Sequence, residues 1–172
     1  MSTPEREEGG AAPKPAQDET GEQRAEPGHD AQRFLAMGRE VLAKQPFSVL
    51  LGAELLGLEP GRCELGVAIT EQLKQQMGFA HGGVVSYLAD NALTYAGGIA
   101  MRVPVVTSEY KINYVRPAIG ERLVAHARAV HVSQSQAVCQ CEVFAVSEGQ
   151  EKLCAIAQGT IVKMGEKNGT SA

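Results

Sequence analysis

The 172-residue chain carries a net charge of −4, and its length suits one domain with an extension. Residues 1–30 hold eight acidic and three basic side chains and are rich in Pro, Gly, Ala, Glu and Gln, so we expect a disordered acidic tail. This segment lacks the apolar run of a secretory signal and is too acidic for a transit peptide, which predicts a cytoplasmic protein. The remaining residues are close to neutral, which argues against nucleic acid as a partner.

Apolar spacing and turn residues divide the rest of the chain into elements. The predicted folded domain covers residues 31–164, and residues 165–172 are expected to form a flexible C-terminal end. The first element is a helix at 31–45, which Pro46 ends. From residue 48 onward the pattern becomes that of strands. The elements expected there are two strands on either side of Pro60–Gly61, a loop at 71–80, a long apolar helix at about 83–101 and four strands at about 105–116, 121–133, 136–147 and 152–163.

The last four strands follow one another with short, turn-rich connections, which predicts an antiparallel meander. One antiparallel sheet wrapped around one long central helix accounts for the order of the elements, so the expected fold class is α+β. The long helix falls slightly short of the ~20 residues that cross a membrane, and it contains Ser86, Asp90, Asn91 and Thr94. We therefore expect this helix to lie inside the sheet, with no membrane partner.

The four cysteines are expected to be small residues of the core. Cys139 and Cys141 are two positions apart, so on a strand they share one face with Val143. Cys63 and Cys154 are isolated, and the chain has no Cys-x-x-C pattern. Because no histidine or further cysteine stands at ligand spacing, no metal site is expected.

The start of the long helix contains two consecutive glycines. Gly82 and Gly83 follow His81 where the loop enters the helix, and without Cβ atoms they let another molecule approach the backbone. Amides in the first helical turn have no partner within the helix, and the helix dipole there favours negative charge. These features predict a binding site for an oxyanion or a carbonyl oxygen at this turn.

Asp90 is the only acidic or basic side chain between Val84 and Met101. Together with Ser86 and Thr94 it lies on one face of the helix, because these residues are four positions apart. A solvated face usually carries Lys and Glu, and an unpaired buried charge is rare. Asp90 is therefore predicted to be functional.

The spacing between the glycines and the carboxylate predicts a dimer. Gly82 and Asp90 are eight residues apart, which is ~12 Å along a helix axis. The carboxylate of one chain therefore cannot reach a carbonyl held at the Gly82 of the same chain. If both residues act on one bond, they must come from two chains, and two antiparallel helices would bring them together twice. A homodimer is then the minimal active unit.

Two stretches of the sequence resemble a known family. GFAHGGVVSYLAD at residues 78–90 and Tyr-Val-Arg-Pro-Ala at residues 114–118 resemble motifs of hotdog-fold acyl-CoA thioesterases of the PaaI-like branch, the phenylacetic acid degradation type. The resemblance covers about residues 47–164 and includes the order of the elements. It implies the hotdog fold, in which a sheet wraps around a long helix.

The resemblance also implies roles for particular residues. Gly82 would give its backbone N–H to the thioester carbonyl, and Asp90 of the opposite subunit would be the nucleophile or general base. A side-chain amide seven residues before this glycine helps to position the catalytic machinery, and Gln75 occupies that position. His81 would support the loop through hydrogen bonds.

Other positions resemble different sub-branches. Gln75 and Thr94 match the Arthrobacter-type 4-hydroxybenzoyl-CoA thioesterase, although that enzyme has Glu where this chain has Asp90. Thr107 falls where a related human acyl-CoA thioesterase has a Ser, and Arg116 could meet the coenzyme A phosphates. This mixture leaves aryl-acetyl, benzoyl and medium-chain acyl groups open. The predicted catalytic residues are Asp90, Gly82, Gln75 and Thr94, and the predicted substrate-binding residues are His81, Gly83, Thr107 and Arg116.

These features predict hydrolysis of acyl-CoA thioesters to a free acid and coenzyme A, with Asp90 as nucleophile or general base. No cofactor and no metal are expected, because coenzyme A enters as part of the substrate. The alternatives are a non-catalytic acyl-CoA-binding hotdog protein, a hotdog dehydratase or hydratase, and a structural module. A dehydratase needs a His partner in motifs that the chain lacks, and a structural module leaves Asp90 unexplained. Dimers of this fold often pair again, so a homotetramer is the expected assembly.

Overall fold

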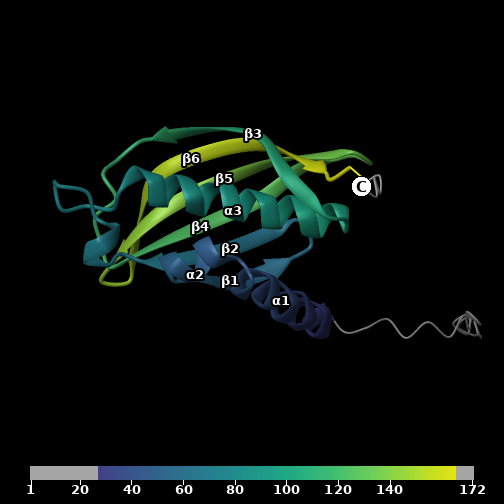
Figure 1. Ribbon diagram of the computed structural model, residues 1–172, viewed down its shortest axis with the longest axis horizontal. Helices are drawn as coiled ribbons and strands as arrows, with labels where there is room; N and C mark the ends of the chain where they lie inside the picture. The colour runs from purple at the N-terminus through teal and green to yellow at the C-terminus, as the bar shows by residue number, and fades with distance from the viewer. Residues whose placement is uncertain (1–26, 166–172) are drawn as a thin grey trace, which may run out of the picture.

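The computed structural model describes residues 27–165. Figure 1 shows α3 lying across a single curved sheet, with α1 and α2 beside its β1 edge. This arrangement confirms the predicted α+β class and is that of the hotdog fold. The elements are α1 (Pro27–Ala43), α2 (Pro46–Leu51), β1 (Ala53–Glu59), β2 (Arg62–Ala68), the short 3-10 helix η1 (Glu71–Leu73), α3 (Gly82–Met101), β3 (Val105–Tyr114), β4 (Arg122–Val132), β5 (Gln136–Ser147) and β6 (Gln150–Lys163).

The six strands lie in the order β1-β2-β4-β5-β6-β3, and all neighbours are antiparallel. The predicted meander is confirmed for β4, β5 and β6 but is wrong for β3, which pairs with β6 at the far edge. Residues 115–121 carry the chain from the end of β3 back to β4. Three strand spacings are ~14 Å, and seven extended residues reach ~23 Å, so a short connection can still cross the end of the sheet. The length of the connection after β3 therefore does not determine with which strand β3 pairs.

The N-terminal helix begins earlier than expected. It starts at Pro27, so residues 27–30 are helical although they were assigned to the acidic tail. Residues 1–26 and 166–172 lie outside the described part of the chain, and the predictions for the tail and the C-terminal end concern mainly those residues.

The strand expected from residue 48 onward begins only at Ala53, because Pro46–Leu51 form α2. Proline suits the first turn of a helix, where its fixed φ matches and its missing N–H is not needed. Gly52 ends α2 in the left-handed conformation, with φ 65°. The buried Ser48 attaches α2 to α3, because the Tyr87 hydroxyl donates to its Oγ at 2.7 Å.

The inner face of α3 packs against the sheet through small and medium apolar residues. The helix approaches the sheet closely at Gly97, where an added Cβ would lie 2.8 Å from Cβ of Ile161 on β6. No helix of the described residues is long and apolar enough to cross a membrane. The buried residues of α3 are Val84, Val85, Leu88, Ala89, Ala92, Leu93, Ala96 and Gly97.

The four cysteines are buried and free, as predicted. Burial raises the pKa of Cys139 and of Cys154 to about 11 and that of Cys141 to about 12, and it raises the pKa of Cys63 further. Protonated, enclosed thiols are poor nucleophiles and poor metal ligands. No group of three or more His, Cys, Asp or Glu side chains within residues 27–165 could hold a metal ion.

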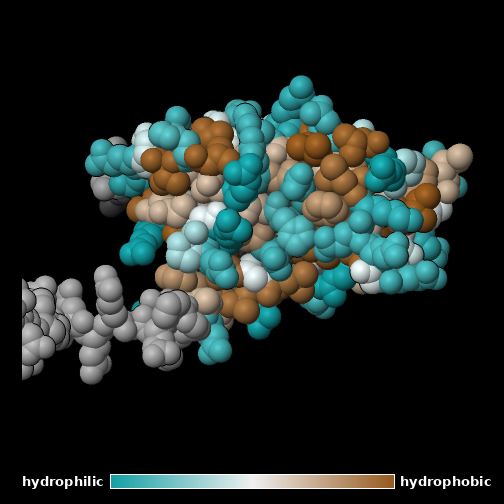
Figure 2. Space-filling view, turned by 180° about the vertical axis from the view of Figure 1, so that it is seen from behind, coloured by the Kyte–Doolittle hydropathy of each residue, from teal (hydrophilic) through white to brown (hydrophobic). Residues whose placement is uncertain are grey.

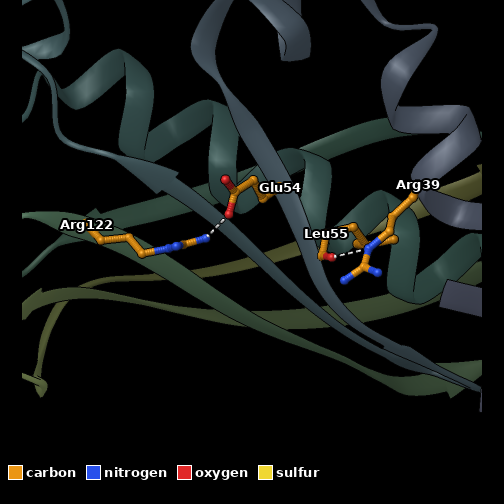
Figure 3. A network of polar contacts seen from close by, with 4 residues as sticks. All are labelled: Arg39, Glu54, Leu55 and Arg122. Atoms are coloured by element: carbon orange, nitrogen blue, oxygen red, sulfur yellow. Dashed lines mark hydrogen bonds and ion pairs between the residues drawn. The ribbon is translucent and has the colours of Figure 1, made fainter. Parts of the chain in front are cut away.

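Two arginines attach β1 to the rest of the molecule, as Figure 3 shows. Nε of Arg39, on α1, donates to the carbonyl oxygen of Leu55 at 3.0 Å. Nη2 of Arg122, on β4, donates to Oε2 of Glu54 at 2.6 Å. On the face opposite to that of Figure 1, hydrophilic and hydrophobic areas are interspersed (Figure 2).

Candidate active site

Asp90 is half-buried on the side of α3 that faces β3. The Thr107 hydroxyl donates to its Oδ1 at 2.7 Å, and the Thr94 hydroxyl donates to its backbone oxygen at 2.9 Å. The two hydroxyls are also 2.8 Å apart. Two hydroxyl protons serve three contacts, and the carboxylate is the strongest acceptor among them. The geometry therefore favours Thr107 as donor to Asp90, with the Thr94 proton shared between its two neighbours.

The helix face that carries Ser86, Asp90 and Thr94 forms hydrogen bonds with side chains of β3. This face is therefore not simply solvated. Ser86, one turn before Asp90, has its Oγ 2.5 Å from the Tyr110 hydroxyl. Thr107 and Tyr110 are three positions apart, so a regular strand would point them to opposite faces. The β3–β6 register shifts between Thr107 and Glu109, and this bulge turns both side chains toward the helix.

The start of α3 leaves one backbone amide without a partner. The carbonyl oxygen of His81 accepts from the amides of Val84 and Val85, and its Nδ1 accepts from the amide of Gly83 at 2.9 Å. The amide of Gly82 has no acceptor among the described residues. His81 thus satisfies the other amides of the first turn and leaves that of Gly82 free for a ligand.

A cleft of about 580 Å³ opens beside this turn. The Tyr114 ring lines it, and the Tyr114 hydroxyl donates to the carbonyl oxygen of Gly82 at 3.0 Å. Asp90 is not among the described residues that line the cleft. The lining residues are Phe79, Ala80, Gly82, Gly83, Val85, Tyr114, Val115, Arg116, Pro117, Ala118 and Cys154.

Of the remaining predicted site residues, Arg116 lines the cleft, whereas Gln75 lies outside it. Gln75 is half-buried in the loop before α3, and its Oε1 accepts from the amide of Met77 at 2.9 Å. Arg116 lines the cleft and donates from Nη1 to the carbonyl oxygen of Leu153 at 3.0 Å. Within one chain the structure brings together Asp90, Thr94 and Thr107, and separately Gly82, Gly83 and Arg116.

A second cleft, of about 490 Å³, lies on the side of the sheet away from α3. Its charged side chains have both signs, and none of the predicted site residues lines it. The acidic ones are Glu64, Glu109 and Glu142, and the basic ones include Arg62, Lys111 and Arg128.

The single antiparallel sheet and the long helix that it wraps define a hotdog-fold protein. A sequence model of the Thioesterase superfamily matches residues 77–152, and relatives more than 30% identical to this chain show that it belongs to this superfamily. A thioesterase family protein of Silicibacter pomeroyi is 33% identical, with a TM-score of 0.71 over 77% of this chain and 99% of that one.

Two PaaI proteins are also similar to this chain. The phenylacetic acid degradation protein PaaI of Thermus thermophilus, in a mutant form, is 34% identical, with a TM-score of 0.61 over 70% of this chain and 100% of that one. The acyl-coenzyme A thioesterase PaaI of Escherichia coli is 27% identical over 116 residues, which are 67% of this chain and 80% of that protein. These relatives confirm the resemblance to the PaaI-like branch.

Proposed function

We propose that the protein hydrolyses acyl-CoA thioesters, with Asp90 of one chain and Gly82 of another acting on one thioester bond. One observation carries the proposal. The same helix presents the Asp90 carboxylate, which accepts a hydrogen bond from Thr107, and the backbone amide of Gly82, which has no acceptor among the described residues. Membership of the Thioesterase superfamily supports the reaction class, and the relative named acyl-coenzyme A thioesterase supports coenzyme A as the leaving group.

The free amide of Gly82 would donate to the thioester carbonyl oxygen and stabilise the negative charge that develops there. The Asp90 carboxylate would then follow one of two routes. It attacks the carbonyl carbon, which releases the thiolate of coenzyme A and leaves a mixed anhydride that water cleaves. Alternatively it takes a proton from a water molecule, which attacks in its place. Both routes end in a free acid and coenzyme A.

Four features support a site built from two chains. Asp90 and Gly82 are ~12 Å apart along α3, and the cleft beside Gly82 does not include Asp90. β3 is an edge strand of ten residues, and an edge of this length can pair with a second copy. Exposed Val106, Tyr114 and Val115 lie on or next to this edge. A homodimer is the minimal active unit in this proposal, and a homotetramer would consist of two such dimers.

The supporting residues have narrower proposed roles. Arg116 is the cation of the cleft and would contact a phosphate of coenzyme A. Gln75 would hold the loop before α3 through its bond to the amide of Met77. His81 would keep the first turn of the helix in place, and Gly83 would let the substrate approach the backbone.

Replacing Thr107 by Val is expected to lower kcat about tenfold, because Asp90 loses the hydroxyl that holds its carboxylate while the size of the side chain is kept. Thr160→Val is the matched control, since its hydroxyl donates to the carboxylate of Glu109 at 2.5 Å on the other side of the sheet. Steady-state kinetics of both variants check this expectation. Equal kcat values for the two variants would show that Thr107 does not serve Asp90.

The experiment that tests the function is a panel of acyl-CoA esters followed by release of free thiol. The panel contains phenylacetyl-, benzoyl-, 4-hydroxybenzoyl- and medium-chain acyl-CoA, and at least one ester is expected to be turned over many times per subunit. Calorimetry on the same esters separates catalysis from binding. Tight binding of an ester without thiol release would replace the proposal by a non-catalytic acyl-CoA-binding protein.

A further inference from the structure

Tyr114 connects the last position of β3 to the first residue of α3. Its hydroxyl donates to the carbonyl oxygen of Gly82 at 3.0 Å, over a separation of 32 residues in the chain. Its ring carbons and hydroxyl lie 3.6–3.7 Å from the point where a Cβ of Gly82 would stand. The side chain is also part of the wall of the cleft, and 54% of the residue is exposed. Tyr114 therefore lines the cleft and also forms a hydrogen bond to the first residue of α3.

The first turn of α3 needs a contact of this kind to fix its conformation. Gly82 and Gly83 have no side chains with which to pack, and glycine loses more conformational freedom on ordering than any other residue. The first turn of a helix also tends to fray. His81 holds the amides of Gly83 and of the two valines that follow, but no acceptor among the described residues holds the amide of Gly82. The direction of that amide thus depends on contacts that fix the glycine from its other side.

We propose that Tyr114 is a positioning residue for the carbonyl-binding amide of Gly82. This inference rests on the proposed function. The hydroxyl holds the carbonyl group of Gly82 against the end of β3 and so restricts the rotation of a glycine that lines the cleft. An amide that is fixed before the reaction stabilises the charge on the carbonyl oxygen without reorganising. This charge is largest in the transition state, so the hydrogen bond from Tyr114 affects the rate of the reaction more than it affects substrate binding.

The test compares Tyr114→Phe with Tyr95→Phe. The Tyr95 hydroxyl donates to the carbonyl oxygen of Gly38 at 3.0 Å, so both variants lose one hydrogen bond from a tyrosine to a glycine carbonyl. Tyr114→Phe is expected to lower kcat about tenfold with KM changed less than about twofold, which is a smaller loss than removal of an oxyanion donor causes. Tyr95→Phe is expected to keep the wild-type kcat. Thermal unfolding of both variants verifies that each is folded.

A second measurement does not depend on turnover. A ketone analogue of the acyl-CoA substrate keeps the carbonyl group, whereas an alkyl thioether of coenzyme A has none. Calorimetry should show that Tyr114→Phe weakens binding of the ketone by about twofold and leaves the thioether unchanged, because only the ketone uses the Gly82 amide.

The outcomes separate this inference from the function on which it rests. If the wild type releases thiol and Tyr114→Phe matches Tyr95→Phe in kcat and in ketone binding, Tyr114 has no positioning role although the function stands. If Tyr114→Phe weakens binding of both analogues and leaves kcat unchanged, Tyr114 is only a wall of the cleft and the inference is overturned. A wild type that hydrolyses no ester of the panel overturns the function and this inference together.

Discussion

Replacing Asp90 by Asn is expected to lower turnover of the best acyl-CoA substrate by about 10² or more. Asn has the same shape, and its amide oxygen can still accept the hydrogen bond that Thr107 gives to Oδ1 of Asp90. The substitution therefore keeps the local packing and removes only the negative charge. An amide can neither form the mixed anhydride nor take a proton from water, so both routes of the mechanism lose their reactive group.

Glu54→Gln is the matched control for this substitution. It also replaces a carboxylate by an amide of the same shape, but Glu54 lies on β1, where it pairs with Arg122 at the surface. An exposed ion pair contributes little to stability, so this variant is expected to retain activity within about twofold of the wild type. Single-turnover measurements on both variants report the chemical step directly. An Asp90→Asn variant with most of its activity would contradict the assigned chemistry.

Much of the fold could be predicted because its signals are local. The apolar run after Gly83 is too long for a strand, and the strands β4, β5 and β6 are separated by recognisable turn residues. Burial of Cys139 and Cys141 followed from the two-residue period of a strand. The place of β3 could not be predicted, because a connection of seven residues can reach either the neighbouring strand or the far edge of the sheet.

The contacts of the site could be predicted only where they join residues that are close in the sequence. Helical spacing placed Thr94 near Asp90, since residues four apart share a helix face. The contact between Thr107 and Asp90 depends on a bulge in β3, which leaves no clear mark in the sequence. The bond from Tyr114 to Gly82 joins residues 32 positions apart, and only the packing of β3 against α3 creates it. Tyr114 belonged to a recognised motif, but the motif gave no role to its hydroxyl.

The second large effect concerns the shared site and uses a variant disabled on the amide side. An added Cβ at Gly82 would lie in ordinary contact with the Tyr114 side chain, so Gly82→Val is compatible with the fold, while its branched side chain projects beside the backbone amide and blocks the approach of a carbonyl group. Homodimers of this variant are expected to be nearly inactive, as are those of Asp90→Asn. In a heterodimer of the two, one site receives both defects and the other receives Asp90 and Gly82 intact.

Mixing the two inactive homodimers under conditions that allow subunit exchange tests the shared site most directly. Random exchange at equal concentrations makes about half of the dimers heterodimers with one intact site of two, so activity should rise to about a quarter of the wild-type value. Mass spectrometry of chains with different isotope labels verifies that exchange has taken place. Activity that returns with the appearance of heterodimers is the result expected of a site built from two chains. Activity that stays at background after complete exchange would contradict it.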